Sequence, residues 1–72
     1  MKLAYLGLKT KPETKYFAGG YVRFYTIDQE LYYEVEKVSL QNAGTIDGGK
    51  VMNKEHLDQL MNCKSIKEYV QV

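Results

Sequence analysis

The sequence predicts a small α+β domain, in which a twisted antiparallel sheet of four to five strands has one helix, from the C-terminal half, packed on one face. Two stretches, residues 15–27 and 30–40, are rich in aromatic and β-branched residues, which favour strands. After residue 53, leucine and methionine recur at helical spacing. The 72 residues suit a single domain, residues 1–72.

The first fourteen residues predict one short strand followed by a connection. Residues 2–8 form a short β-prone run. Residues 9–14 are polar and include Pro12, the only proline, which has no N–H to donate to a sheet ladder. We therefore expect this second segment to be exposed and to lie outside the sheet.

Residues 15–27 contain two adjacent glycines, Gly19 and Gly20, which allow two arrangements. In the first, they form the two-residue turn of a hairpin that places Phe17 opposite Val22. In the second, they form a bulge within one long strand. We favour the hairpin, because two glycines accept positive φ at both turn positions.

Residues 30–40 alternate between apolar and polar side chains. Alternation predicts a buried set that consists of Leu31, Tyr33 and Val35. The other face then carries Tyr32, Glu34 and Glu36. After Lys37 the apolar positions shift by one residue to Val38 and Leu40, so we expect a bulge or a twist near Glu36-Lys37.

The segment that follows predicts turns and then a helix. Residues 41–44 and 47–49 have turn composition, with residues 45–46 and 50–52 as short arms around the second turn. Asn53 is a good N-terminal cap for a helix that ends near Cys63-Lys64.

The tail, residues 65–72, allows two interpretations. Its aromatic and β-branched residues favour a closing strand, whereas Ser65 followed by Glu68 resembles the capping box of a helix. We choose the strand.

Cysteine content and hydropathy predict a cytoplasmic protein. Cys63 is the only cysteine, so the chain cannot form an internal disulfide, whereas secreted domains of this size usually carry several. The apolar run at the start stops at Lys9 and has no signal-peptide cleavage pattern after it. No stretch approaches the roughly 20 apolar residues that a membrane span requires, and we expect no membrane association.

The sequence offers few reactive groups, and we predict that the protein is not an enzyme. Zinc sites usually need four ligands, but the chain has one histidine, His56, and one cysteine, Cys63. These two lie seven residues apart on the expected helix, about 10 Å along its axis, which is too far for a Cys–His pair. We therefore predict no catalytic residue, no metal site and no cofactor.

Recognition of another protein is the function that the sequence favours. Seven tyrosines are more than so small a core can bury, and tyrosine is enriched at protein interfaces. The predicted protein-binding residues are Tyr32 and the acidic residues around it, Glu30, Glu34 and Glu36. An exposed tyrosine among carboxylates suits a basic partner. Free sheet edges also allow pairing with a second copy, so a homodimer is a further expectation.

The alternative is a nucleic-acid-binding surface that combines basic and aromatic side chains. Its residues are Lys9, Lys11, Lys15, Tyr21, Arg23 and Tyr25. Sheets that bind single strands stack bases on such aromatic rings. The net charge of only +1 argues against it, because nucleic-acid-binding domains are usually strongly basic.

In size and in its tyrosine- and glutamate-rich composition, the chain resembles small bacteriophage and mobile-element proteins. Many of these inhibit a host enzyme by binding to it. The likeness implies an inhibitor or modulator of a larger host protein.

Overall fold

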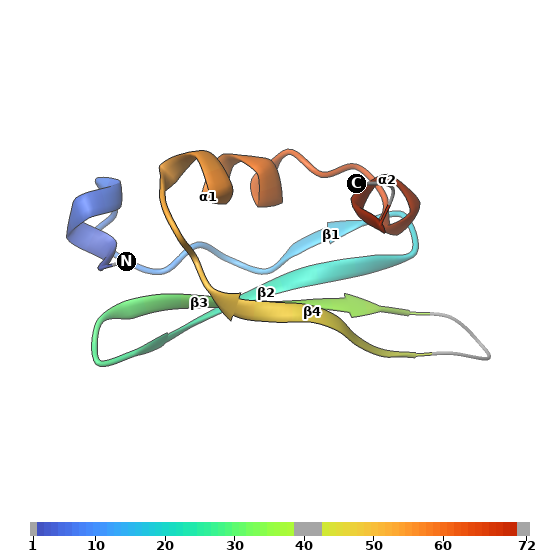
Figure 1. The fold of residues 1–72 in the computed structure, drawn as a ribbon, viewed down its shortest axis with the longest axis horizontal. Coiled ribbons are helices and arrows are strands. Elements are labelled where there is room, and N and C mark those ends of the chain that lie inside the picture. The colour runs from blue at the N-terminus through green and yellow to red at the C-terminus, as the bar shows by residue number, and fades with distance from the viewer. Residues whose placement is uncertain (1, 39–42, 71–72) are drawn as a thin grey trace.

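The computed structural model describes residues 2–38 and 43–70, which form four antiparallel strands and three short helices (Figure 1). In chain order the elements are the 3₁₀ helix η1 (Leu3–Leu6), β1 (Lys15–Phe17), β2 (Gly20–Ile27), β3 (Glu30–Lys37), β4 (Gly44–Lys50), α1 (Lys54–Met61) and α2 (Ile66–Val70). The predicted α+β class is confirmed, as is a main helix in the C-terminal half.

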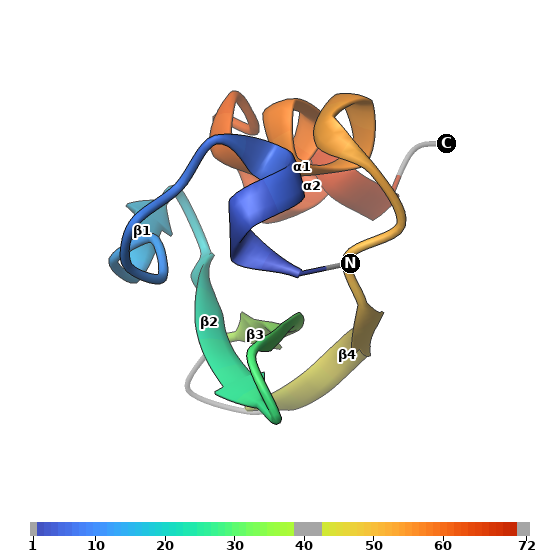
Figure 2. The same ribbon diagram turned by 90° about the vertical axis from the view of Figure 1, so that its left-hand side faces the viewer.

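The strands lie in the order β1-β2-β3-β4 and form one curved sheet. Figure 2 shows that η1, α1 and α2 all lie on the concave side of this sheet. The core fills the space between them and consists of Leu6, Val22, Phe24, Leu31, Tyr33, Val35, Val51, Leu57 and Leu60. Within residues 2–38 and 43–70, no helix covers the convex side of the sheet.

The predicted alternation along β3 is confirmed. Leu31, Tyr33 and Val35 are buried on the concave side, and the residues between them are half-exposed on the convex side. β3 pairs with β2 over eight residue pairs, from Gly20↔Lys37 to Ile27↔Glu30. Asp28 and Gln29 form the connecting turn and both have positive φ, as a tight two-residue hairpin turn requires.

The β1–β2 hairpin confirms the favoured arrangement but corrects its register. Phe17 pairs with Gly20 and not with Val22, so the turn residues are Ala18 and Gly19. Gly19 has the positive φ, at 87°. Gly20 is needed for a different reason, because a Cβ at this position would lie 2.2 Å from the carbonyl oxygen of Glu36.

The turn predicted at residues 47–49 is wrong, because residues 44–50 form one continuous strand, β4. The register of β3 and β4 shifts between Val35 and Glu36, which pair with Asp47 and Thr45 and leave Ile46 as an extra residue. A bulge therefore lies one residue from the predicted place, with its extra residue in β4. Leu40 and residues 41–42 of the turn predicted at residues 41–44 lie outside the described residues, and Gly44 begins β4.

The strand predicted at residues 2–8 is also wrong. Residues 3–6 form η1, and Gly7 ends it with a left-handed φ of 74°. Leu6 is buried in the core, with Leu3 and Leu8 packed against its rim. A short apolar run fits either a strand or a helical turn, and packing into the concave side of the sheet decides for the helical turn.

The helix after Asn53 is confirmed, and its cap is the predicted one. The side-chain oxygen of Asn53 accepts a hydrogen bond of 2.8 Å from the His56 amide. α1 ends at Met61, two residues before the predicted end.

The strand chosen for the tail is wrong over the described residues. Residues 66–70 form α2, and the Ser65 hydroxyl accepts a hydrogen bond of 3.0 Å from the Glu68 amide, as the capping-box interpretation predicts. The backbone of Ser65 and Ile66 also pairs with Ala18, which ties α2 to the β1–β2 turn.

Candidate protein-binding face

The convex side of the sheet presents a surface that we call the open face. Residues directly opposite each other in an antiparallel pair point to the same side, so the register assigns the members. The open face consists of Tyr16, Tyr21, Arg23, Tyr25, Ile27, Glu30, Tyr32, Glu34, Glu36, Thr45, Gly48 and Lys50. Four of the seven tyrosines of the chain lie on it.

Tyrosine rings form two pairs on this face. Tyr25 lies directly opposite Tyr32, and their rings stack with centroids 5.7 Å apart and planes 19° apart. Tyr16 lies opposite Tyr21, with centroids 5.6 Å apart and planes tilted by 47°. Tyr16 is 76% exposed. The two pairs place aromatic surface at both ends of the face, in geometries that aromatic pairs favour.

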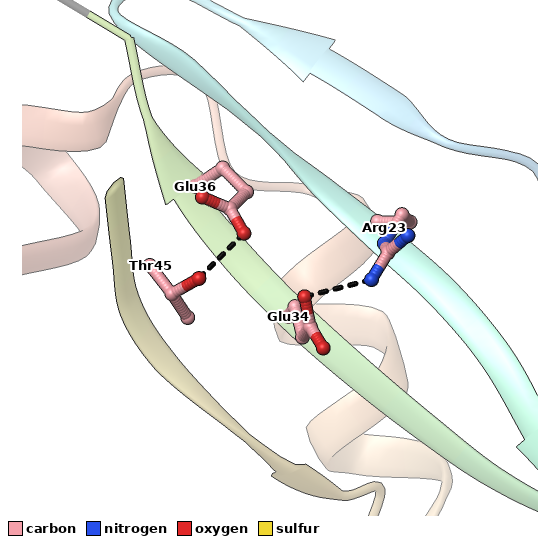
Figure 3. A network of polar contacts seen from close by, with 4 residues as sticks. All are labelled: Arg23, Glu34, Glu36 and Thr45. Atoms are coloured by element: carbon pink, nitrogen blue, oxygen red, sulfur yellow. Dashed lines mark hydrogen bonds and ion pairs between the residues drawn. The ribbon is translucent and has the colours of Figure 1, made fainter. Parts of the chain in front are cut away.

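An ion pair separates the two aromatic pairs. Arg23 lies opposite Glu34, and its Nη2 is 2.9 Å from the Glu34 Oε2 (Figure 3). The hydrogen bond and charge of Glu34 raise the pKa of Arg23. The guanidinium also lies 5.7 Å from the centroid of the Tyr25 ring, within cation–π distance.

A second ion pair lies at the β4 side of the face. Lys50 Nζ is 3.3 Å from Glu30 Oε2 and 6.0 Å from the centroid of the Tyr32 ring. The ladder sets this arrangement, because Lys50 lies directly opposite Tyr32. Each basic residue of the open face thus contacts both a carboxylate and a tyrosine ring.

Glu36 differs from the other two carboxylates. Its Oε1 accepts a hydrogen bond of 2.6 Å from the hydroxyl of Thr45, its partner across the ladder (Figure 3). Among the residues that the structure describes, no basic side chain lies within ion-pair distance of Glu36. The open face carries two basic and three acidic side chains, which leaves a net charge of −1.

The predicted protein-binding residues come together, whereas the predicted nucleic-acid-binding residues do not. Glu30, Tyr32, Glu34 and Glu36 all lie on the open face. Of the alternative set, Tyr21, Arg23 and Tyr25 lie there too. Lys15 lies opposite Val22 and therefore on the concave side, while Lys9 and Lys11 lie in the connection before β1.

Tyr16, Thr45 and Lys50 belong to the face but were not predicted as site residues. Thr45 and Lys50 were missed because residues 47–49 read as a turn, which separates these two from each other and from β3. Tyr16 could have been found from the sequence, because a hairpin whose turn is centred one residue earlier than predicted places it opposite Tyr21.

The edges of the described sheet are β1 and β4. β4 is the longer one, with seven residues, and carries the bulge at Ile46. Bulges are a common means of discouraging edge-to-edge pairing. The bulge therefore makes the β4 edge less suited to pairing with a further strand.

A separate polar cluster lies on the concave side, around Asp47. Its carboxylate accepts hydrogen bonds from the hydroxyls of Tyr33, at 3.1 Å, and Tyr69, and from the Gly48 amide. Burial raises the pKa of Asp47, but the three hydrogen bonds outweigh it and the net shift is downward. Burial and the same carboxylate raise the pKa of Tyr33 and Tyr69. The cluster joins β4 to α2 and is structural.

His56 and Cys63 each have a local hydrogen-bond partner. The His56 Nδ1 accepts a hydrogen bond from the Met52 amide, and its ring packs edge-on against Tyr33. Cys63 is buried, and its thiol donates to the carbonyl of Ser65. The described part of the chain contains no cluster of three or more metal-ligating side chains.

Comparisons with models of protein families, with curated proteins and with solved structures found no match for this chain. None of the helices in residues 2–38 and 43–70 has the length and apolar character needed to cross a bilayer.

Proposed function

We propose that the protein is a non-enzymatic binding protein that docks on a larger protein through the open face. The observation that carries the proposal is the uncovered convex side of the sheet, where four tyrosines and two ion pairs lie together. On the concave side, the apolar side chains of the sheet are buried against the helices and form the core. The convex side, which no described helix covers, therefore keeps its tyrosines and ion pairs accessible to a partner.

The composition of the face supports a protein partner. Tyrosine and arginine are enriched at the energetic centres of protein interfaces, because a rigid amphipathic ring buries large area at low entropic cost. The cross-strand pairs hold Tyr25, Tyr32 and Arg23 in place before a partner arrives. Such preorganisation reduces the entropy lost on binding. Docking would make the chain an inhibitor or modulator of that partner.

The charge of the face favours protein over nucleic acid. A nucleic-acid surface needs an excess of basic groups to neutralise phosphates. The open face has a net negative charge, and both of its basic side chains already pair with carboxylates. Under this proposal, single-stranded oligonucleotides bind no more tightly at low salt than at high salt.

An affinity purification from the native source tests the proposal with three baits. The first is the wild type, and the second carries Tyr25→Ala and Tyr32→Ala on the open face. The third is the matched control Tyr5→Ala, which removes a tyrosine that is 78% exposed in η1, outside the sheet. We expect a partner that is retained by the wild type and the control but lost by the double variant.

Hydrogen exchange on the isolated complex then locates the contact. Burial of the open face slows exchange in β2 and β3 and leaves α1 unchanged. Equal recovery of every partner by all three baits, or protection confined to the helices, would contradict the proposal.

A further inference from the structure

The open face carries one carboxylate whose charge no basic side chain of the described chain offsets by direct contact. Arg23 pairs with Glu34, and Lys50 pairs with Glu30, whereas Glu36 is held by a hydroxyl, that of Thr45. Arg23 lies close enough for the charge of Glu36 to contribute to its raised pKa, after the larger effect of Glu34. One guanidinium can offset only one of the two carboxylate charges, so one negative charge remains.

Aromatic surface lies beside that charge. Tyr21 is directly opposite Glu36 in the β2–β3 ladder, and Tyr16 is opposite Tyr21 on the other side. Side chains opposite each other in an antiparallel pair have Cβ atoms about 5 Å apart. The row Tyr16, Tyr21, Glu36 and Thr45 therefore sets two tyrosine rings next to a carboxylate. Both rings also line a hollow of about 370 Å³ at the hairpin end of the sheet, with Phe17 and Val38.

A ring face beside a carboxylate is suited to a cation. The faces of tyrosine rings attract lysine and arginine, and a nearby carboxylate adds an ion pair. The same chain uses this combination twice for itself, because Arg23 lies over Tyr25 while bonded to Glu34, and Lys50 lies over Tyr32 while bonded to Glu30. The Tyr21–Glu36 row has the ring and the carboxylate but not the cation.

We propose that the partner supplies this missing group: a lysine or arginine side chain that lies on the Tyr21 ring and pairs with the Glu36 carboxylate. The hollow beside Tyr21 accommodates the aliphatic part of that side chain. The inference rests on the proposed function, since it assumes that a protein docks on the open face. It adds that the docking segment is basic.

A display library of random peptides about 12 residues long provides the probe. Selection is run in parallel on the wild type, on Glu36→Gln and on the matched control Glu13→Gln, which removes the same charge at an exposed position before β1. We expect lysine and arginine to be enriched among peptides selected by the wild type and by the control, but not among those selected by Glu36→Gln.

One selected peptide is then titrated against each variant. We expect Glu36→Gln to weaken binding about three- to tenfold, and Tyr21→Leu to weaken it by a similar factor because it removes the ring. Circular dichroism verifies that each variant is folded, so that a loss of binding or of basic enrichment reports the lost contact and not unfolding.

The outcomes separate the two proposals. Peptides that require Tyr25 and Tyr32 but show no basic enrichment, or that bind Glu36→Gln as tightly as the wild type, overturn the basic contact and leave the docking face standing. Failure to select any peptide that depends on the open face counts against both.

Discussion

The hydrogen bonds to Asp47 hold α2 against the sheet, and replacing Tyr69 by phenylalanine tests this directly. Tyr69→Phe removes one hydroxyl and keeps the ring that packs against the core. A hydrogen bond to a charged group is worth about 1.5–3 kcal/mol when buried. Because Asp47 and Tyr69 are both half-exposed, water replaces part of the lost interaction. We therefore expect a loss of about 1 kcal/mol in the free energy of unfolding.

Replacing the acceptor has a larger effect than replacing one donor. Asp47→Ala leaves two hydroxyls, those of Tyr33 and Tyr69, without their acceptor. We expect a loss of about 2–3 kcal/mol. In the Asp47→Ala background, Tyr69→Phe then has almost no further cost, so the two changes show a coupling energy of about 1 kcal/mol.

Urea unfolding followed by circular dichroism measures these differences, and 1 kcal/mol corresponds to roughly 4–8 °C in Tm for a domain of this size. Tyr5→Phe is the matched control, because the Tyr5 side chain is exposed. Hydrogen exchange in residues 66–70 accelerates in Tyr69→Phe but not in the control. If Tyr69→Phe has the same cost with and without Asp47, the carboxylate does not hold α2 and the reasoning fails.

Three further predictions concern the backbone, the helix cap and pH. Gly20→Ala places a Cβ 2.2 Å from the Glu36 carbonyl oxygen, and we expect a cost of about 3 kcal/mol by urea unfolding; a cost below about 1 kcal/mol would mean that the strands are further apart than described. Asn53→Ala removes the cap of α1 and costs about 1 kcal/mol, whereas Asn53→Ser retains most of the stability. Because the fold lowers the pKa of Asp47, the stability that this carboxylate contributes is complete above its ordinary pKa of about 3.9 and is lost as the pH falls through the lower folded value. Urea midpoints between about pH 6 and pH 2.5 are thus expected to converge for the wild type and Asp47→Asn at the acid end, and parallel curves would exclude the effect.

The elements that were predicted correctly are those in which local pattern and packing agree. Alternation along β3 assigned each side chain to a face, because a one-residue error would bury Glu34 and expose Val35. The cap of α1 was equally readable, since Asn53 satisfies backbone amides of its own first turn.

Two of the errors concern segments whose conformation is set by distant residues. The glycines at positions 48 and 49 suit a turn, but their place opposite Glu34 and Tyr33 keeps them in an edge strand. In the first hairpin, Gly20 lies so close to the Glu36 carbonyl that a side chain at this position would clash with it. Neither contact can be inferred from neighbours in the sequence.

The open face, too, has members that the local sequence predicts and members that only the pairing of distant strands reveals. The carboxylates and Tyr32 could be placed together from β3 alone. Their partners Lys50 and Thr45 could not, because the pairing of β4 with β3 decides which side chains meet. The sequence therefore shows an acidic stripe, while the structure shows a face on which Glu36, unlike Glu30 and Glu34, forms no ion pair with a described basic side chain.

If the open face docks on a protein as proposed, its central ion pair selects among partners. A partner that covers Arg23 and Glu34 removes water from both charges, which is unfavourable unless it supplies hydrogen bonds of its own. A partner with a purely apolar surface would bury the tyrosine rings. It would also remove water from the ion pair without replacing those hydrogen bonds, so it would bind poorly. A partner with polar groups opposite the pair and apolar groups opposite the rings satisfies both. The alternation of rings and charges along β2 and β3 therefore favours one pattern of partner over general hydrophobic association.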